Sequence, residues 1–413
     1  MRVISAGVVF FFYFLCICVA EAQHVSVPRF DCEMLIVPAS VNGIERCAII
    51  DTGASTIMMD ERLAVNSLRV AHSREIVTRT ISGVQRIRLY DNMKYRVLGL
   101  PEQTGSVSTF DLEECRTITG QDIQLLIGMS AMKSYVLSLS PTCGELSSGV
   151  SDSVDIGKEF SITWNHAGIP QCNTQFGDGS LLLTSMDTGL NVELALEKAE
   201  LTSLLRRGEA RRVGGFKTGQ QRAPEHFVVR EFEVFGVLFR NVFAVEAKMN
   251  AIGLPILCQL KLTLDFPNSR VFRGAPDESG LDSFPPNASG IYVNRTVDRT
   301  TQVLSVFPDS PAGSVGVQNG DMLLAIDGIT AEQLSIIELR ERLRKAGTTV
   351  RLAIERNGES LQIDVPLEHP FEYPPKWPPR PEPSKDQLDF EKFLKGQESG
   401  NPDSEPRPEC ATF

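Results

Sequence analysis

The chain has 413 residues, enough for about three domains of ordinary size. Hydrophobic residues make up 42% of it and charged residues 23%, which excludes a fully disordered or fibrous protein. The formal net charge of −11 argues against a chain built to bind nucleic acid.

The first 22 residues are predicted to be a signal peptide. Arg2 supplies the positive start, residues 8–20 are apolar, and Ala20-Glu21-Ala22 is a small-x-small cleavage site. The apolar core is shorter than the roughly 20 residues that a membrane span needs. We therefore expect export to the periplasm or the extracellular space, with no membrane span after cleavage. An uncleaved membrane anchor is the alternative.

Seven cysteines follow the signal segment, and they show no regular spacing. An odd number leaves at least one thiol free, and the sequence leaves the pairing open. The chain has no Cys-x-x-Cys pair and no cluster of histidines, so we expect neither a metal nor another cofactor. The seven are Cys32, Cys47, Cys115, Cys143, Cys172, Cys258 and Cys410.

Residues 23 to about 275 consist of short apolar runs separated by Gly, Asn and Pro. Runs of this length predict a mainly β body. Only Glu61–Val70 and Val192–Arg207 favour helices. The runs that we expect to be strands include Met34–Val37, Cys47–Ile50, Ser134–Leu139, Leu181–Leu183 and Val234–Val237.

The same region contains an internal repeat, which predicts two halves of similar topology. Asp51-Thr52-Gly53 comes eight residues after Gly43, and Asp187-Thr188-Gly189 comes eight residues after Gly179. Another glycine follows each aspartate at a similar interval: Gly99 after 48 residues and Gly236 after 49.

Each half then closes with an Ile-Gly pair between apolar residues, Leu126-Ile127-Gly128-Met129 and Ala251-Ile252-Gly253-Leu254, and a strand is expected after each. We place the first lobe at 23–146 and the second at 147–276.

Two aspartates that lie side by side where the two halves meet can act together as a general acid and a general base. Carboxylates within hydrogen-bond distance share one proton, so one member can act as a general base on water while the other acts as a general acid. The threonine hydroxyl can lock the loop, and the glycine lets backbone pass close to the carboxylate.

Asp51-Thr52-Gly53-Ala54-Ser55, after the apolar Ala48-Ile49-Ile50, resembles the active-site signature of bacterial retropepsin-like aspartic proteases. The resemblance covers about residues 30–275. It implies a bilobal, pseudo-dimeric β-barrel body of the pepsin and retropepsin kind. Asp51 and Asp187 are then the catalytic pair, with loop support from Thr52, Gly53, Thr188 and Gly189. Leu190 departs from the pattern, because the family usually has a small residue there.

Such proteases close a hairpin flap over the substrate, and two glycine-containing segments are candidates. Gly83 follows Asp51 by 32 residues, and Gly214 and Gly215 precede Phe216 in the second half. Glycine permits a tight and movable tip. Each segment can equally be an ordinary surface hairpin.

A third module is expected at 277–368. Pro308-Asp309-Ser310-Pro311-Ala312-Gly313 and the segment from Val317 to Gly328 resemble the core of a bacterial PDZ domain. Thr330 and Gln333 form a capping box that begins a helix ending at Ala346, before Gly347. The strands are expected at 302–307, 322–326, 350–355 and 361–365.

The PDZ resemblance implies an α+β domain that binds an extended peptide between the helix and one strand. The groove residues would be Gly290, Ile291, Tyr292 and Leu334. A domain that only packs against the rest of the chain is the alternative.

Residues 369–413 are rich in proline and charge, and we predict a disordered tail. A docking motif within Pro374–Pro381 is the alternative.

The favoured function is an exported aspartic endopeptidase acting on protein or peptide substrates, with a peptide-binding PDZ domain. An inactive peptide-binding adaptor is the alternative. A serine protease is disfavoured, because the chain has no Gly-x-Ser-x-Gly and its five histidines lack a nearby Ser/Asp arrangement. The sequence leaves the oligomeric state open.

Overall fold

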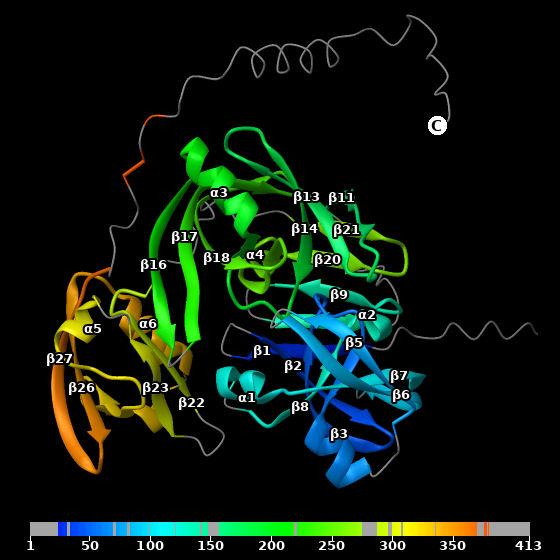
Figure 1. Ribbon diagram of the computed structural model, residues 1–413, viewed down its shortest axis with the longest axis horizontal. Coiled ribbons are helices and arrows are strands. Elements are labelled where there is room, and N and C mark those ends of the chain that lie inside the picture. Colours follow the sequence, from blue (N-terminus) through cyan, green and yellow to red (C-terminus); the bar gives the residue numbers. More distant parts are fainter. Residues whose placement is uncertain are drawn as a thin grey trace, which may run out of the picture.

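The computed structural model describes residues 24–30, 34–68, 72–80, 83–97, 99–119, 121–140, 143–147, 157–218, 221–274, 287–295, 300–306, 309–334, 336–369, 376–377 and 379. The predicted signal peptide, Cys32, Cys410 and most of the tail lie outside these residues. Two β lobes pack together, and a smaller domain lies beside them (Figure 1). One hydrophobic core runs through both lobes and a second fills the smaller domain.

The first lobe is a closed six-stranded barrel. Its strands follow the order β2-β3-β8-β4-β7-β6, and β6 pairs again with β2 to close the barrel. β5 extends the sheet as a hairpin with β6. The elements of this lobe are β1 (His24–Phe30), β2 (Met34–Val41), β3 (Ile44–Ile50), β4 (Ile57–Asp60), η1 (Leu63–Leu68), β5 (Arg74–Thr80), β6 (Gly83–Val97), β7 (Gln103–Phe110), α1 (Glu113–Thr119), β8 (Ile123–Ile127), α2 (Met129–Met132), β9 (Val136–Leu139) and β10 (Cys143–Ser147).

The second lobe repeats this barrel strand for strand. Its order is β13-β14-β19-β15-β18-β17, closed by pairing of β17 with β13, and β16 extends the sheet as β5 does in the first lobe. The elements are β11 (Lys158–Ser161), β12 (Thr163–Trp164), β13 (Pro170–Phe176), β14 (Leu181–Asp187), β15 (Leu194–Glu197), α3 (Lys198–Arg207), β16 (Ala210–Thr218), β17 (Gln221–Val234), β18 (Val237–Ala247), β19 (Ala251–Gly253), α4 (Leu254–Gln259), β20 (Leu262–Asp265) and β21 (Arg270–Arg273).

A shared sheet joins the lobes. β9 of the first lobe pairs antiparallel with β20 of the second, with Leu137 opposite Leu264. The sheet extends through β10 and β1 on one side and through β21 and β11 on the other. The Ser138 and Thr263 hydroxyls lie 3.2 Å apart across the junction. The lobes are therefore held as one body with an approximate twofold relation, which confirms the bilobal fold class.

The smaller domain has the α+β arrangement expected from its sequence. Its strand order is β22-β23-β24-β26-β27, with β25 paired to β24. The Thr330–Gln333 capping box is present, but the helix is divided into a short 3₁₀ turn and α6. The elements are β22 (Ile291–Arg295), β23 (Thr301–Val306), α5 (Pro311–Ser314), β24 (Met322–Ile326), β25 (Ile329–Thr330), η2 (Ala331–Gln333), α6 (Ile336–Arg344), β26 (Thr348–Arg356) and β27 (Glu359–Leu367).

Several sequence-based boundaries are wrong. Val234–Val237 is not a strand but the turn between β17 and β18, because Phe235 and Gly236 adopt φ values of +50° and +73°. The helix expected from Val192 begins only at Lys198, since Leu194–Glu197 is strand β15. A short helix, α2 or α4, follows each Ile-Gly closure before the expected strand. Among the described residues, no helix is both long and apolar enough to cross a membrane.

Candidate active site

The two Asp-Thr-Gly segments occupy equivalent places in the two barrels. Asp51 follows β3, which runs parallel to β8, and Asp187 ends β14, which runs parallel to β19. Equivalent loops of two lobes related by an approximate twofold axis meet at the seam. The structure therefore brings together the two aspartates that the sequence repeat predicted as a pair.

Backbone amides hold each carboxylate. The amides of Gly53 and Ala54 donate to Asp51 Oδ1 at 2.8 and 3.1 Å, and the Gly189 amide donates to Asp187 Oδ1 at 2.9 Å. Both aspartates are partly exposed residues. Hydrogen bonds of this kind orient a carboxylate and stabilise its ionised form.

The two threonines tie the loops to each other across the seam. The Thr52 hydroxyl accepts from the Thr188 amide at 3.0 Å and donates to the Met186 carbonyl at 2.6 Å. The Thr188 hydroxyl accepts from the Thr52 amide at 3.1 Å and donates to the Ile50 carbonyl at 2.9 Å. Both threonines are fully buried. The sequence suggested a hydroxyl that locks the loop, but not that the partner lies in the other lobe.

The glycines after the threonines are needed for close approach. A Cβ added at Gly53 would overlap the carboxyl group of Asp187, and one at Gly189 would overlap that of Asp51. Each carboxyl group therefore packs on the backbone of the opposite loop, where only glycine fits.

We expect Gly53→Ala and Gly189→Ala each to destabilise the folded chain by about 1–3 kcal/mol, because the added methyl forces the aspartates apart. Gly274→Ala is the matched control, since its nearest neighbour would be 3.4 Å away. Urea unfolding of the three variants tests this. Equal destabilisation by all three would contradict the close approach.

A second pair of glycines packs behind the active-site loops. At Gly128 a Cβ would meet the carbonyl oxygens of Thr56 and Ala54, and at Gly253 those of Val192 and Leu190. The Met129 amide donates to Ala54 at 2.8 Å, and the Leu254 amide donates to Leu190 at 2.9 Å. Leu190 thus makes the same backbone hydrogen bond as Ala54, so the departure from the family pattern leaves the second loop intact.

The pKa values of both aspartates are raised, and burial is the largest cause for each. For Asp187 burial has the largest effect, and the neighbouring charge and hydrogen bond of Asp51 raise its pKa further, well above the ordinary value of 3.8. For Asp51 burial also raises the pKa, while the hydrogen bond from Asp187 and those from two backbone amides oppose the rise. Because both pKa values are raised, the pair retains a proton to a pH above the ordinary carboxyl range.

The sequence did not point to Glu193, a buried carboxyl group six residues after Asp187. Burial raises its pKa to about 7, and the positive charge of Arg344, at the end of α6, opposes this rise. The carbonyl oxygen of Glu193 accepts from the Gly253 amide at 2.9 Å, so the residue belongs to the framework of the second loop. The structure thus places a charge of the smaller domain near that loop.

Glu193→Gln should change how stability depends on pH. A carboxyl pKa raised from 4.5 to about 7 destabilises the folded state progressively as pH rises through that interval. We expect the variant to be more stable than wild type by up to about 3 kcal/mol at pH 8 and equally stable near pH 4. Denaturant titrations at both pH values test this, with exposed Glu197→Gln as control. A constant difference between wild type and variant would contradict the interpretation.

The flap candidates lie in equivalent hairpins. Gly83 begins β6, directly after the part of the β5–β6 hairpin that lies outside the described residues. Gly214 and Gly215 were expected at a hairpin tip, but they lie within β16. The pairing of β16 with β17 is irregular on both sides of them. The pairing continues to Thr218 opposite Gln221, so the tip comes later in the chain.

The predicted groove residues of the smaller domain gather beside α6. Gly290, with φ +72°, leads into Ile291 and Tyr292 at the start of the edge strand β22. Leu334 is buried immediately before α6, and its carbonyl accepts from Arg295.

Two arginines not identified from the sequence form hydrogen bonds between β22 and the helical segments beside it. Arg340 of α6 donates to the Val293 carbonyl at 3.0 Å from Nη2 and lies 5.3 Å from the Tyr292 ring centre. Arg295 of β22 donates to the Ala331 and Leu334 carbonyls at 2.7 Å. The helix and the edge strand are thus already cross-linked by charged side chains.

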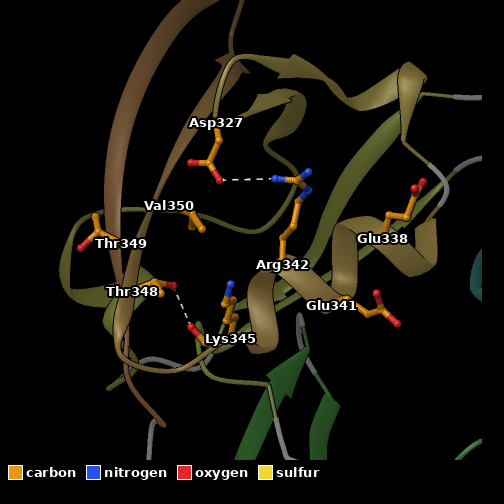
Figure 2. Close-up of a pocket in the computed structure, with 8 residues that line it drawn as sticks. All are labelled: Asp327, Glu338, Glu341, Arg342, Lys345, Thr348, Thr349 and Val350. Atoms are coloured by element: carbon orange, nitrogen blue, oxygen red, sulfur yellow. Dashed lines mark hydrogen bonds and ion pairs between the residues drawn. The ribbon is translucent and has the colours of Figure 1, made fainter.

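A hollow of about 500 Å³ lies where α6 meets the start of β26 (Figure 2). Arg342 pairs with Asp327 at 3.7 Å, and the Thr348 hydroxyl donates to the Lys345 carbonyl. The hollow is therefore a polar surface of the smaller domain with internal pairs, separate from the aspartates. Its lining residues are Asp327, Glu338, Glu341, Arg342, Lys345, Thr348, Thr349 and Val350. Within the described part of the chain, no group of three or more His, Cys, Asp or Glu residues forms a metal site.

Comparisons with known proteins match the two parts separately. Residues 37–131 match the family model described as aspartyl protease, and residues 302–356 match the PDZ domain model. "Serine protease HTRA1" of Xenopus tropicalis is 33% identical over 85 residues, which are 21% of this chain and 16% of that protein.

A "Carboxyl-terminal-processing protease" of Picosynechococcus is 34% identical over 96 residues, which are 22% of this chain and 23% of that protein. The chain thus spans less than a quarter of the length of the curated relatives it matches. These matches support a protease-type function. With the fold, they show that the chain combines an aspartyl protease-like body with a C-terminal PDZ domain.

Proposed function

We propose that the chain is an aspartic endopeptidase in which Asp51 and Asp187 share one proton and activate a water molecule. The observation that carries the proposal is the crosswise hydrogen bonding of Thr52 and Thr188, which holds both carboxyl groups at one seam. The packing of each aspartate on the opposite glycine supports the same pairing.

In the proposed reaction, ionised Asp51 takes a proton from water, which attacks the scissile carbonyl carbon. Protonated Asp187 gives its proton to the carbonyl oxygen, and a tetrahedral diol forms. Asp51 then passes its proton to the leaving amine, while Asp187 recovers a proton as the carbonyl re-forms. Every proton is returned, so no cofactor is required.

The PDZ domain is proposed to bind an extended peptide or a substrate C-terminus along β22. Its edge position supports this, since only β23 pairs with β22 in the described sheet. An inactive adaptor was suggested by Leu190, but the intact hydrogen bonding of the second loop favours the enzyme. The matched proteins named as serine proteases share only a short segment, so their catalytic type is not transferred.

The test is hydrolysis of an unfolded protein, such as reduced and alkylated casein, from pH 3 to pH 8, with fragments identified by mass spectrometry. We expect a bell-shaped dependence, because activity needs one ionised and one protonated carboxyl group. A serine-directed fluorophosphonate should leave the rate unchanged. Inactivation by that reagent, or peptide binding without turnover by the folded protein, would contradict the proposal.

Export is proposed on the sequence of residues 1–22. N-terminal sequencing of the protein recovered outside the cytoplasm is expected to begin at Gln23. Recovery of the uncleaved chain in the membrane fraction would contradict it.

A further inference from the structure

The sequence led us to expect a disordered tail, but two of its residues, Lys376 and Trp377, lie against the second lobe. The Trp377 indole N–H donates to Asn241 Oδ1 at 2.8 Å, and the Arg230 guanidinium lies 5.7 Å from the ring centre. Arg211 Nη1 donates to the Lys376 carbonyl at 2.7 Å. At these two positions the tail therefore makes defined contacts with the second lobe.

The surface that receives them is formed by regular elements of the barrel. Arg211, Arg230 and Asn241 come from three neighbouring strands, β16, β17 and β18. Leu205 and Gly208 at the end of α3 lie on the other side of a hollow of about 490 Å³ that Lys376 and Trp377 also line. Because strands of one sheet carry the contacting groups, their relative positions are fixed before the tail arrives.

The chemistry of this surface suits a tryptophan within a proline-rich segment. Trp377 is partly buried and offers an N–H for the amide oxygen of Asn241 and a π face for Arg230. The chain around it reads Pro374-Pro375-Lys376-Trp377-Pro378-Pro379. Prolines restrict the free segment to extended conformations, so less conformational entropy is lost on binding.

The chain's own connectivity favours binding within one molecule. β27 of the PDZ domain ends at Leu367, nine residues before Lys376. Nine residues of extended chain can span at most about 30 Å. A connection this short keeps the local concentration of the tail at about millimolar, so even a weak site is filled. The other tether of the PDZ domain, residues 275–286, starts from the same lobe.

We propose that this surface is a binding site for a proline-flanked tryptophan, and that the chain's own tail occupies it as a strap between the PDZ domain and the second lobe. The strap contacts β16 and β17, which form the second candidate flap hairpin. β16 also lies next to β23 of the PDZ domain (Figure 1). The hairpin is thus contacted by the PDZ domain and the tail together.

Trp377 fluorescence tests the strap without reference to peptidase activity. The chain has two tryptophans, so Trp164→Phe leaves Trp377 as the sole fluorescent tryptophan. As a second route that keeps Trp164, the spectrum of Trp377→Phe is subtracted from that of wild type, which leaves the emission of Trp377. We expect Trp377 in the full chain to be quenched by acrylamide at least threefold less efficiently than in a free peptide of residues 370–385. Equal quenching in chain and peptide would overturn the proposal.

Variants of the receiving surface give a second readout. Asn241→Ala and Arg211→Ala should raise Trp377 quenching at least twofold, towards the peptide value. Arg240→Ala is the matched control, because Arg240 lies beside Asn241 on β18 but pairs with Glu231. No difference between Asn241→Ala and the control would overturn the site. Trp377 quenching by acrylamide that is constant from 0.5 to 50 μM protein supports a strap within one chain. Quenching that rises on dilution would assign the tail to a second copy and overturn the proposed strap.

Discussion

Asp51→Asn and Asp187→Asn are each expected to lower the rate of peptide-bond hydrolysis by roughly 10³-fold or more. Asparagine has nearly the same shape as aspartate, but its amide can neither accept the proton of water nor donate one to the carbonyl oxygen. Initial rates on an unfolded protein, measured across the active pH range, give the effect. Each carboxyl group has its own step, so the two variants should be similarly impaired.

Asp122→Asn provides the control for this prediction. Asp122 is exposed and accepts a hydrogen bond from Gln124 on the surface of the first lobe. Its substitution should leave the rate unchanged. Near-normal hydrolysis by either Asp51→Asn or Asp187→Asn, in a variant shown to be folded, would rule out the carboxyl pair as the catalytic machinery.

Thr52→Val and Thr188→Val are each expected to reduce the free energy of unfolding by about 2–4 kcal/mol. Valine matches threonine in shape but removes a hydroxyl that both accepts from an amide and donates to a carbonyl of the other lobe. Two buried polar groups then lose their partners, at about 1–3 kcal/mol each. Urea denaturation measures the change.

Thr52→Ser and Thr188→Ser separate the hydroxyl from the methyl group. Because serine retains the donor and acceptor, we expect each serine variant to lose at most half of the free energy of unfolding that the matching valine variant loses. If serine and valine variants were equally destabilised, the cost would come from packing rather than from the crosswise hydrogen bonds.

The repeat in the sequence predicted the site well because it is a local pattern that is present twice. Asp51 and Asp187 stand at the ends of apolar runs that became β3 and β14, and the Ile-Gly pairs after them became the supporting glycines. A twofold relation then follows from topology alone. The PDZ strands were equally predictable, since their apolar alternation is regular.

Contacts between distant segments could not be predicted in this way. The hydroxyl of Thr52 finds its partners 134 and 136 residues away, at Met186 and Thr188, and nothing local in either segment encodes that geometry. Glu193 reads as an ordinary surface residue, and only the barrel and the neighbouring domain make it buried.

The tail shows how composition can mislead. Proline and charge predict disorder along residues 369–413, because such a segment cannot form a core of its own. Trp377 instead uses a surface of the second lobe that already exists, and its partner Asn241 is 136 residues away. The boundary errors at Val192 and Val234 have a simpler cause. Strand β15 runs directly into α3 with no Gly or Pro between them, and the turn residue Phe235 is as apolar as the strands beside it.

The central claim, that the two aspartates share a proton at the seam, is tested most directly by ¹³C NMR of protein labelled at the aspartate carboxyl carbons. In wild type, we predict two signals that titrate together in two separated steps, with the higher step well above pH 3.8 because burial and the neighbouring charge raise the pKa of Asp187. In Asp187→Asn, the Asp51 signal should titrate in one step. Two independent titrations near pH 3.8 in wild type would contradict the claim.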